Sequence, residues 1–256
     1  MDKPYFSFAG QDSRDYGIWI TSKQVYGGGA ADVTQQSISG RNGDLLIPNK
    51  RRKNHSVSYG IYLQTPAGLT LCEASMRVRC WLYRSTQYQK LFDSYQPEFY
   101  RWAAYLEEFA LEDSGIRDAT GTLTFTAKPG LHYFTGDWPV SGTGSVKLIN
   151  PSPEPALPVI RIPAVSGVTT ILVQNDKGSF SYPFGAEGES YTDVVVNCET
   201  MKLYEDKPVP VNLFGVCGFP LEFPSLAEGV NTVTLVGSDL QTKNIAFTVE
   251  PRWVAP

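Results

Sequence analysis

Histidine is scarce in this sequence, which contains only His55 and His132 among its 256 residues. Neither belongs to a cluster with the spacing of a metal site. Neither accompanies a Gly-x-Ser-x-Gly nucleophile motif, and a Ser-His-Asp triad would need distant segments to meet. The sequence therefore predicts no metal centre, no cofactor and no catalytic residue, and we interpret His55 as an exposed loop residue.

Cysteine is also sparse, and the four that occur show no Cys-x-x-Cys spacing: Cys72, Cys80, Cys198 and Cys217. We interpret them as core or surface thiols. The first residues lack the basic and apolar segments of a signal peptide. No apolar run approaches the roughly 18 residues that a membrane-spanning helix needs. We expect a soluble protein, made in a cytoplasm, without disulfide bonds or membrane insertion.

A concentrated charge of one sign is absent as well. The formal net charge is −4. Residues 1–135 carry 15 Lys and Arg against 13 Asp and Glu, a net charge of +2, and residues 136–256 carry 7 against 13, a net charge of −6. Neither half has the basic face of a sequence-specific nucleic-acid reader.

Residues 1–135 predict a β-rich domain with one helix. Alternating or β-branched stretches predict strands at residues 5–8, 16–21, 32–39, 44–47, 57–64 and 120–127. The period changes between Leu71 and Arg84, where apolar residues recur at helical spacing and predict a helix near 72–84. Residues 99–111 alternate like a strand but also contain helix-forming residues, so both assignments stay open.

Residues 136–256 predict an antiparallel β-sandwich. The segment 136–158 is rich in Gly, Ser, Pro and Asn and is interpreted as a linker. Short strands are then expected at residues 159–162, 169–174, 193–197, 201–204, 231–236 and 244–249. The segment from Gly218 to Trp253 alternates turn residues with β-branched runs, which is typical of hairpin edges, and we expect Trp253 to pack against the sandwich.

Two segments in this half resemble chemical motifs only weakly. Gly142–Ser145 lacks the Gly-Lys-Ser/Thr ending of a phosphate loop and is better explained as linker. Glu187, Glu189 and Asp193 offer carboxylates for a calcium site or a cell-wall hydrolase, but the EF-hand spacing is missing. A solvated loop is the simpler interpretation.

Aromatic residues are abundant, with 14 Tyr, 13 Phe and 5 Trp. They permit an alternative function, a carbohydrate-binding β-sandwich module in which rings stack on sugars. The second half, however, has few tryptophans, Trp138 at its start and Trp253 at its end. Core packing and interface burial account for most of the rings.

Six residues are the candidate contacts with other subunits or partners. Asn42 belongs to a Gly-Arg-Asn-Gly sequence, Gly40–Gly43, that predicts a tight hairpin turn. A basic run follows, which we interpret as a solvated hairpin tip or a contact for an acidic partner. The candidates are Arg41, Asn42, Lys50, Arg51, Arg52 and Lys53.

Several strings, in this order and spacing, resemble siphophage distal tail proteins (the Dit family). In the first half these are the opening Phe6–Ile18, the Gly40–Gly43 turn, a helix running into Cys80-Trp81-Leu82, and a strand ending at Lys128-Pro129. In the second half they are Asn150-Pro151, Pro158–Ile162, Gly218–Pro220, Pro224–Leu226, Gly229–Asn231 and Pro251–Trp253. The resemblance covers nearly the whole chain.

The resemblance implies a non-enzymatic assembly hub at the virion tail tip, made in the bacterial host cytoplasm. It implies a ring-forming N-terminal β domain with one helix and a galectin-like C-terminal β-sandwich. Six N-terminal domains would close a homo-hexameric ring between the tail tube protein and the tail-associated tip protein. Receptor-binding or baseplate proteins would attach around it, and phage DNA would pass non-specifically through its centre, which the basic run could line.

Two features depart from or qualify this pattern. Some members of the family carry a long arm in the second domain, whereas residues 136–256 hold no extra block, so we expect the loop Asn175–Gly188 to be the nearest equivalent. Gly27–Gly29 suggests a mobile or partner-ordered loop in the ring domain.

Overall fold

The computed structural model describes residues 3–24, 26–213, 222–237 and 245–256. The chain divides into two compact units, Met1–Leu131 and His132–Pro256, compared with the division at residue 135 expected from the sequence. Each is described by itself. Cys217 and the string Gly218–Pro220 lie outside the described residues.

The N-terminal unit is a mainly antiparallel sheet with one α-helix among its described residues. The central path of the sheet has the order β2-β1-β7-β8-β10-β6-β3, and β9 pairs with β10. The elements are β1 (Phe6–Phe8), β2 (Gln11–Asp12), the 3-10 helix η1 (Ser13–Tyr16), β3 (Ile18–Ile20), β4 (Ala31–Gln36), β5 (Leu45–Arg52), β6 (His55–Gln64), α1 (Leu71–Leu82), β7 (Gln89–Asp93), β8 (Phe99–Ala104), β9 (Leu111–Asp113) and β10 (Asp118–Ala127). Residues 99–104, left open between helix and strand, are therefore strand.

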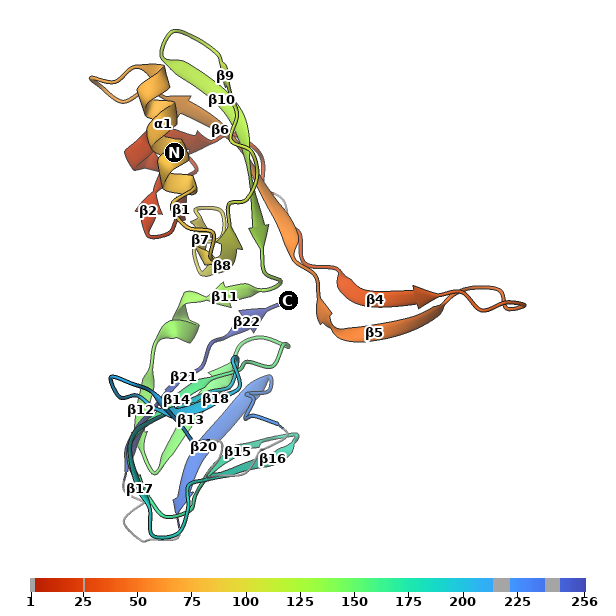
Figure 1. Ribbon diagram of the computed structural model, residues 1–256, viewed down its shortest axis with the longest axis vertical. Coiled ribbons are helices and arrows are strands. Elements are labelled where there is room, and N and C mark those ends of the chain that lie inside the picture. Colours follow the sequence, from red (N-terminus) through yellow and green to blue (C-terminus); the bar gives the residue numbers. More distant parts are fainter. Residues whose placement is uncertain (1–2, 25, 214–221, 238–244) are drawn as a thin grey trace. The chain divides into compact units, whose positions relative to one another are not determined.

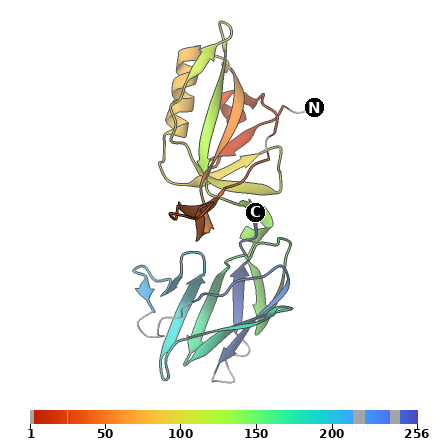
Figure 2. The same cartoon turned by 90° about the vertical axis from the view of Figure 1, so that its right-hand side faces the viewer.

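Helix α1 begins where its sequence can satisfy the free backbone N–H groups of a first turn. The Thr70 backbone N–H donates to Glu73 Oε2 at 2.8 Å, and the Glu73 N–H donates to Thr70 Oγ1 at 3.3 Å, which forms a capping box. The helix ends at Leu82, two residues before the predicted end, and buries Ala74, Val78, Trp81 and Leu82 against the sheet. Figure 2 shows α1 lying beside the strands of this unit.

Aromatic side chains dominate the core of this unit. Phe6 lies between Tyr59 and Trp81, with ring centroids 5.5 and 5.7 Å apart. Trp81 also donates its indole N–H to the Phe8 carbonyl at 3.1 Å, so its polar atom is satisfied while the ring is buried. Leu123 and Phe125 point into the same core from β10, on the face opposite the threonines, as the alternation predicts.

The C-terminal unit is an antiparallel β-sandwich. One sheet has the order β12-β21-β14-β17-β18-β19 and the other β13-β20-β15-β16. The elements are β11 (Leu131–Tyr133), η2 (Phe134–Asp137), β12 (Val140–Thr143), β13 (Ser145–Asn150), β14 (Val159–Ser166), β15 (Thr169–Asn175), β16 (Gly178–Phe184), β17 (Ser190–Asn197), β18 (Lys202–Glu205), β19 (Val211–Asn212), β20 (Gly229–Gly237), β21 (Ala246–Glu250) and β22 (Val254–Ala255). Inward side chains from both sheets form one core. The mainly β fold with an N-terminal helix-bearing domain and a β-sandwich is confirmed, whereas its likeness to galectins stays a prediction.

Two segments expected to be irregular are strands. The linker interpretation of residues 136–158 is wrong, because β12 and β13 lie there and pair with β21 and β20. The expectation of a loop at Asn175–Gly188 is also wrong, because this segment contains β16, which pairs with β15. Both segments are rich in turn residues, but partners supplied from elsewhere in the chain outweigh that local preference.

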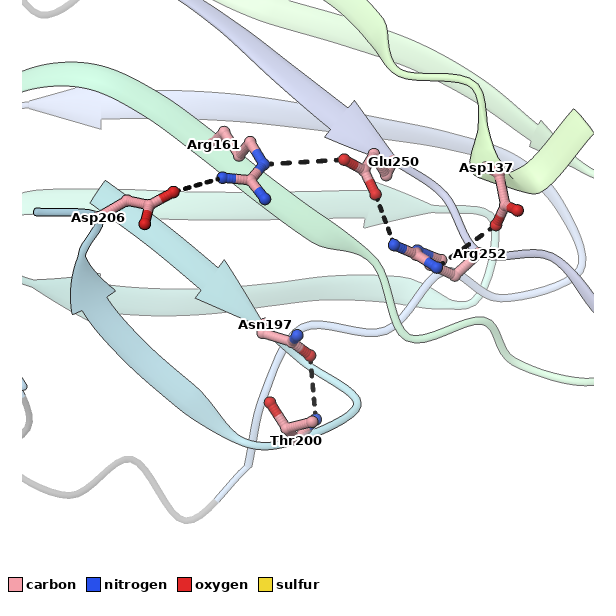
Figure 3. A network of polar contacts seen from close by, with 7 residues as sticks. All are labelled: Asp137, Arg161, Asn197, Thr200, Asp206, Glu250 and Arg252. Carbon is pink, nitrogen blue, oxygen red and sulfur yellow. Dashed lines mark hydrogen bonds and ion pairs between the residues drawn. The ribbon is translucent and has the colours of Figure 1, made fainter. Parts of the chain in front are cut away.

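The end of the chain is held by packing and by charged groups. Trp253 is 6% exposed and belongs to the sandwich core, as expected from the sequence. Arg252 contacts Glu250 at 2.7 Å and Asp137 at 3.4 Å, while Arg161 bridges Glu250 at 3.7 Å and Asp206 at 3.1 Å (Figure 3). Arg161 and Asp206 are about half exposed, so their pair stabilises the fold only weakly.

Glu205 makes the stability of the C-terminal unit depend on pH. Its carboxylate accepts from Lys207 at 2.6 Å and from the Thr192 N–H at 2.9 Å, which lowers its pKa below the usual 4.5. A depressed folded-state pKa stabilises the fold above the unfolded value and loses that contribution as the pH falls through the folded value. We expect the free energy of unfolding, measured in urea, to differ less between pH 3 and pH 6 for Glu205→Gln than for the wild type. The exposed Glu228→Gln should leave the difference unchanged; equal behaviour of the two variants would contradict the assignment.

Candidate interaction surface

Strands β4 and β5 form a two-stranded sheet that pairs with no other strand among the described residues. The pairs run from Ala31 opposite Arg52, at the base, to Gln36 opposite Leu45, near the tip. Figure 1 shows this hairpin extending away from the other strands of the N-terminal unit. We call residues 31–52 the ribbon.

The ribbon exposes apolar side chains that neither a sheet face nor a helix covers. Every residue of β5 is exposed, and the exposed fractions are 60% for Leu46, 42% for Ile38, 41% for Ile47 and 38% for Leu45. An isolated two-stranded hairpin is marginally stable in water. Two free edges and uncovered apolar side chains are features of a surface that another chain completes.

The tip of the ribbon carries Arg41 and Asn42, both exposed. The expected hairpin is present, but the prediction of a tight turn at Asn42-Gly43 is wrong, because the connection between the two strands comprises residues 37–44. Gly40 and Gly43 adopt φ values of 80° and 83°, whereas Asn42 does not enter the left-handed region. The turn therefore depends on the two glycines, with the Arg41 N–H donating to the Ile38 carbonyl at 3.2 Å.

The basic run lies at the other end of the ribbon. Its interpretation as a loop at a hairpin tip is wrong, because Lys50, Arg51 and Arg52 belong to β5. Arg51 contacts Asp32 at 2.6 Å and Lys53 contacts it at 3.6 Å. The hydrogen bond from Arg51 lowers the pKa of the Asp32 carboxyl, so the basic run is partly neutralised within the chain.

A change in register beside Asp32 explains how these charges meet. The pairing shifts between Ala31 and Val33, and Lys50 opposite this shift has a φ of 53°. An irregularity of this kind re-aims the neighbouring side chains. The structure thus separates the six candidate residues into Arg41 and Asn42 at the tip and Lys50, Arg51, Arg52 and Lys53 at the base. Their contacts with other chains stay a prediction.

Sequence reasoning missed the apolar residues of the ribbon and the charge partner Asp32. One signal was present, because the alternating stretch 32–39 before Gly40–Gly43 and the apolar run Leu45–Ile47 after it give a hairpin with apolar side chains on each strand. Alternation indicates which residues share a face, but not whether that face is covered.

The segments that suggested chemistry lie on the surface or in paired strands. Glu187, Glu189 and Asp193 are exposed. Gly142 and Ser145 belong to paired strands, with Gly144 between them at a φ of 74°. No cluster of three metal-ligating side chains occurs in the parts of the chain that the structure describes.

The cysteine thiols and the two tryptophans of the second half differ in their exposure. Cys72 and Cys80 are exposed free thiols, and burial raises the pKa of Cys198 to about 12, so its thiol stays protonated. Trp138 is 65% exposed but Trp253 is buried, so these two do not form a stacking platform for a sugar. None of the described helices is long and apolar enough to cross a membrane.

The β-rich helix-bearing unit followed by a β-sandwich is an arrangement that a solved structure shares. It is similar to the crystal structure of SPP1 Dit (gp 19.1), described as a paradigm of the hub adsorption apparatus in phages that infect Gram-positive bacteria. The TM-score is 0.66, with 15% identity over 97% of this chain and 98% of that chain. The resemblance to distal tail proteins is thus confirmed at the level of the fold. No protein-family model matches the chain, and no curated protein matches its sequence.

Proposed function

We propose that the protein is a structural, non-enzymatic hub at the tip of a long non-contractile phage tail. The observation that carries the proposal is the ribbon, which pairs with no other strand in the described part of the chain and exposes apolar residues. The shared fold with SPP1 Dit over nearly the whole chain supports the same function. The exposed ribbon is suited to contact a neighbouring copy, because repetition of one heterologous contact around an axis closes a ring.

The proposed assembly is a homo-hexamer. In it, the ring joins the tail tube protein on one side to the tail-associated tip protein on the other. Receptor-binding or baseplate proteins attach at the periphery, and DNA passes through the central opening without sequence recognition. Arg41 and Asn42 at the tip of the ribbon and Lys50–Lys53 at its base are the candidate contacts within the ring or with partners.

The size of the particle in solution tests this proposal. We expect light scattering to give about 170 kDa for six chains of 28.3 kDa, and negative-stain images to show six-fold rings with a central opening. Replacing residues 32–51 by a short Gly-Ser linker should yield a monomer, lighter than the 28.3 kDa wild-type chain by the residues removed. A short linker can close the gap because the Lys53 N–H donates to the Ala30 carbonyl at 2.8 Å at the base. The melting temperature of the rest of the chain should change little.

A pair of point variants separates the ribbon from exposed apolar surface in general. Leu46→Asp places a charge on the ribbon, and Ile116→Asp places one at a side chain that is 98% exposed between β9 and β10. Only Leu46→Asp should shift the chain toward monomers. Rings that persist after removal of the ribbon would contradict its role, and a wild-type chain that stays monomeric at high concentration without rings would contradict the hexamer.

A further inference from the structure

An open groove lies beside helix α1 in the N-terminal unit, and none of its lining residues belongs to the ribbon. It has a volume of about 820 Å³ and is bounded by α1, by η1 and by the loop that leads into α1. Figures 1 and 2 both show α1 at the outside of this unit. The volume lies in the range of roughly 300–1,000 Å³ that is usual for ligand sites, so the groove can hold several side chains of a bound segment.

One wall of the groove is apolar and reaches the solvent. The rings of Tyr16 and Trp81 stack there, with their centroids 4.4 Å apart and their planes 8° apart. Pro66, Leu69 and Met76 extend this wall, and Met76 is 50% exposed. Exposed apolar surface bordered by charged groups is a feature of interaction sites.

Two arginines border this wall without a partner. Arg77 and Arg84 line the groove, and neither guanidinium forms an ion pair or a hydrogen bond with a described residue. Burial raises the pKa of Tyr16, Asp15 adds to the rise, and Arg84 and Arg77 oppose it. Both arginines therefore lie close enough to act on the Tyr16 hydroxyl, beside the stacked rings.

The two carboxylates that line the groove are placed differently. Glu73 Oε2 accepts from the Thr70 N–H at 2.8 Å and from the Thr70 hydroxyl at 2.9 Å, at the N-terminus of α1, whose dipole favours a negative charge. Hydrogen bonds from Thr70, and more weakly the charge of Arg77, lower the pKa of Glu73. Asp15 lies in the first turn of η1, within electrostatic reach of Arg14. The later part of α1 thus carries the positive charge that a partner can neutralise.

We propose that this groove is the docking site for an acidic, apolar segment of another protein, whose carboxylates pair with Arg77 and Arg84 and whose apolar side chains cover the stacked rings. A carboxylate matches the planar fork of a guanidinium and accepts two hydrogen bonds from it. An aliphatic or aromatic side chain removes the wall at Tyr16 and Met76 from water. The proposal rests on neither the ribbon nor the hexamer.

A protein segment suits the groove better than a nucleic-acid strand does. A strand carries a negative charge on every nucleotide and would bring phosphates against Asp15 and Glu73. A protein segment can place carboxylates only where the arginines lie and put apolar side chains elsewhere.

Selection from a library of short random peptides, with the full chain as bait, tests the proposal. We expect the peptides enriched on the wild type to combine Asp or Glu with Leu, Phe or Trp, and the double variant Arg77→Gln with Arg84→Gln to lose them. The double variant should keep the melting temperature of the wild type, because both side chains are exposed. Neutral or basic peptides, or the same peptides on both baits, would overturn the proposal.

Affinities of the strongest selected peptide, measured by fluorescence anisotropy, identify the residues that hold it. Arg77→Gln and Arg84→Gln should each weaken binding about two- to fivefold, as partly exposed ion pairs do. Arg79→Gln changes the same charge on the same helix outside the groove lining and should have little effect. Met76→Ser should also weaken binding, whereas Met201→Ser in the C-terminal unit, at a side chain that is 64% exposed, should not. Equal losses from the three arginine variants would show that only net charge matters and would contradict a groove.

Two cysteines locate the bound peptide without any substitution. Cys72 and Cys80 are exposed free thiols of α1, and Cys80 lines the groove whereas Cys72 does not. The bound peptide should slow alkylation of Cys80 by iodoacetamide several-fold and leave the rate at Cys72 unchanged, as read by mass spectrometry. Protection of both thiols, or of neither, would place the peptide elsewhere.

The other two occupants give results of their own. If a second copy fills the groove, the mass of the peptide-free protein in solution falls in the double variant Arg77→Gln with Arg84→Gln. If nucleic acid fills it, single-stranded DNA displaces the peptide and protects Cys80. Either result overturns the proposal; we expect an unchanged mass and no displacement.

Discussion

Replacing Trp253 by alanine is expected to lower the free energy of unfolding of the C-terminal unit by about 3–5 kcal/mol. The indole is 6% exposed and packs in the core between the two sheets. The surrounding backbone also depends on this position, because the Tyr133 N–H donates to the Trp253 carbonyl at 3.1 Å and the Arg252 N–H donates to the Gly136 carbonyl at 2.8 Å. The end of the chain thus closes onto the start of its own unit.

Urea unfolding followed by far-UV circular dichroism measures this change, and Trp138 provides the matched control. Trp138 is 65% exposed, so Trp138→Ala should change the free energy of unfolding by no more than about 0.5 kcal/mol. Deletion of residues 251–256 should destabilise at least as much as Trp253→Ala. Equal effects of the two tryptophan substitutions would show that Trp253 does not contribute to the core.

Gly136→Ala tests the same closure from the other side. A Cβ atom at Gly136 would lie 2.4 Å from the Trp253 backbone nitrogen, a distance that requires the backbone to move. This substitution should therefore destabilise the C-terminal unit while leaving the Trp253 side chain intact. An unchanged melting temperature would mean that the contact between the two segments is loose.

Replacing Asp93 by alanine is expected to lower the free energy of unfolding of the N-terminal unit by about 3–5 kcal/mol. The substitution leaves the Arg101 guanidinium buried without its counter-charge and removes the acceptor of the Tyr59 hydroxyl. It also removes the acceptor of the Tyr95 and Gln96 N–H groups, which shapes the turn after β7. Breaking one partner of a buried pair is costly because the remaining charge stays desolvated.

Two further variants identify the cause of the loss. Asp113→Ala removes an exposed carboxylate from the same unit and should alter the free energy of unfolding by no more than about 0.5 kcal/mol. Asp93→Leu combined with Arg101→Met removes both charges and should be less destabilising than the sum of the two single substitutions. Additive effects would indicate that Asp93 and Arg101 stabilise the fold independently.

Sequence patterns were sufficient for elements whose signals are local. The helical spacing of Val78 and Leu82 specifies α1, and alternation specifies β6 and β10. The patterns failed at β12, β13 and β16, where glycine, serine and proline resemble a linker. Position 142 of β12 requires glycine, because a Cβ atom there would lie 2.5 Å from the Ser145 carbonyl oxygen. This close approach is visible only once the strands are placed in space.

On the candidate surface, too, the sequence shows some features, whereas others depend on how the strands pair. The basic run and the Gly40–Gly43 turn are visible in the sequence, but Asp32 reaches Arg51 only because β4 and β5 pair with a shifted register. The interpretation of His55 as an exposed loop residue is wrong, because it begins β6 and is partly buried. It lines a small cavity with Asp93 and Arg101, which are distant in sequence and arrive on β7 and β8.

By itself, the sequence determined that this is a mainly β protein with one helix, a second half built from short strands and a buried Trp253. Periodicity and turn residues suffice for these features because they act over a few residues. Only the tertiary structure decided that β10 pairs with β6, that Asp93 neutralises Arg101, and that Leu46 and its neighbours stay uncovered. Burial and charge pairing depend on which distant segments meet, and a local pattern shows that a face is apolar without showing what, if anything, covers it.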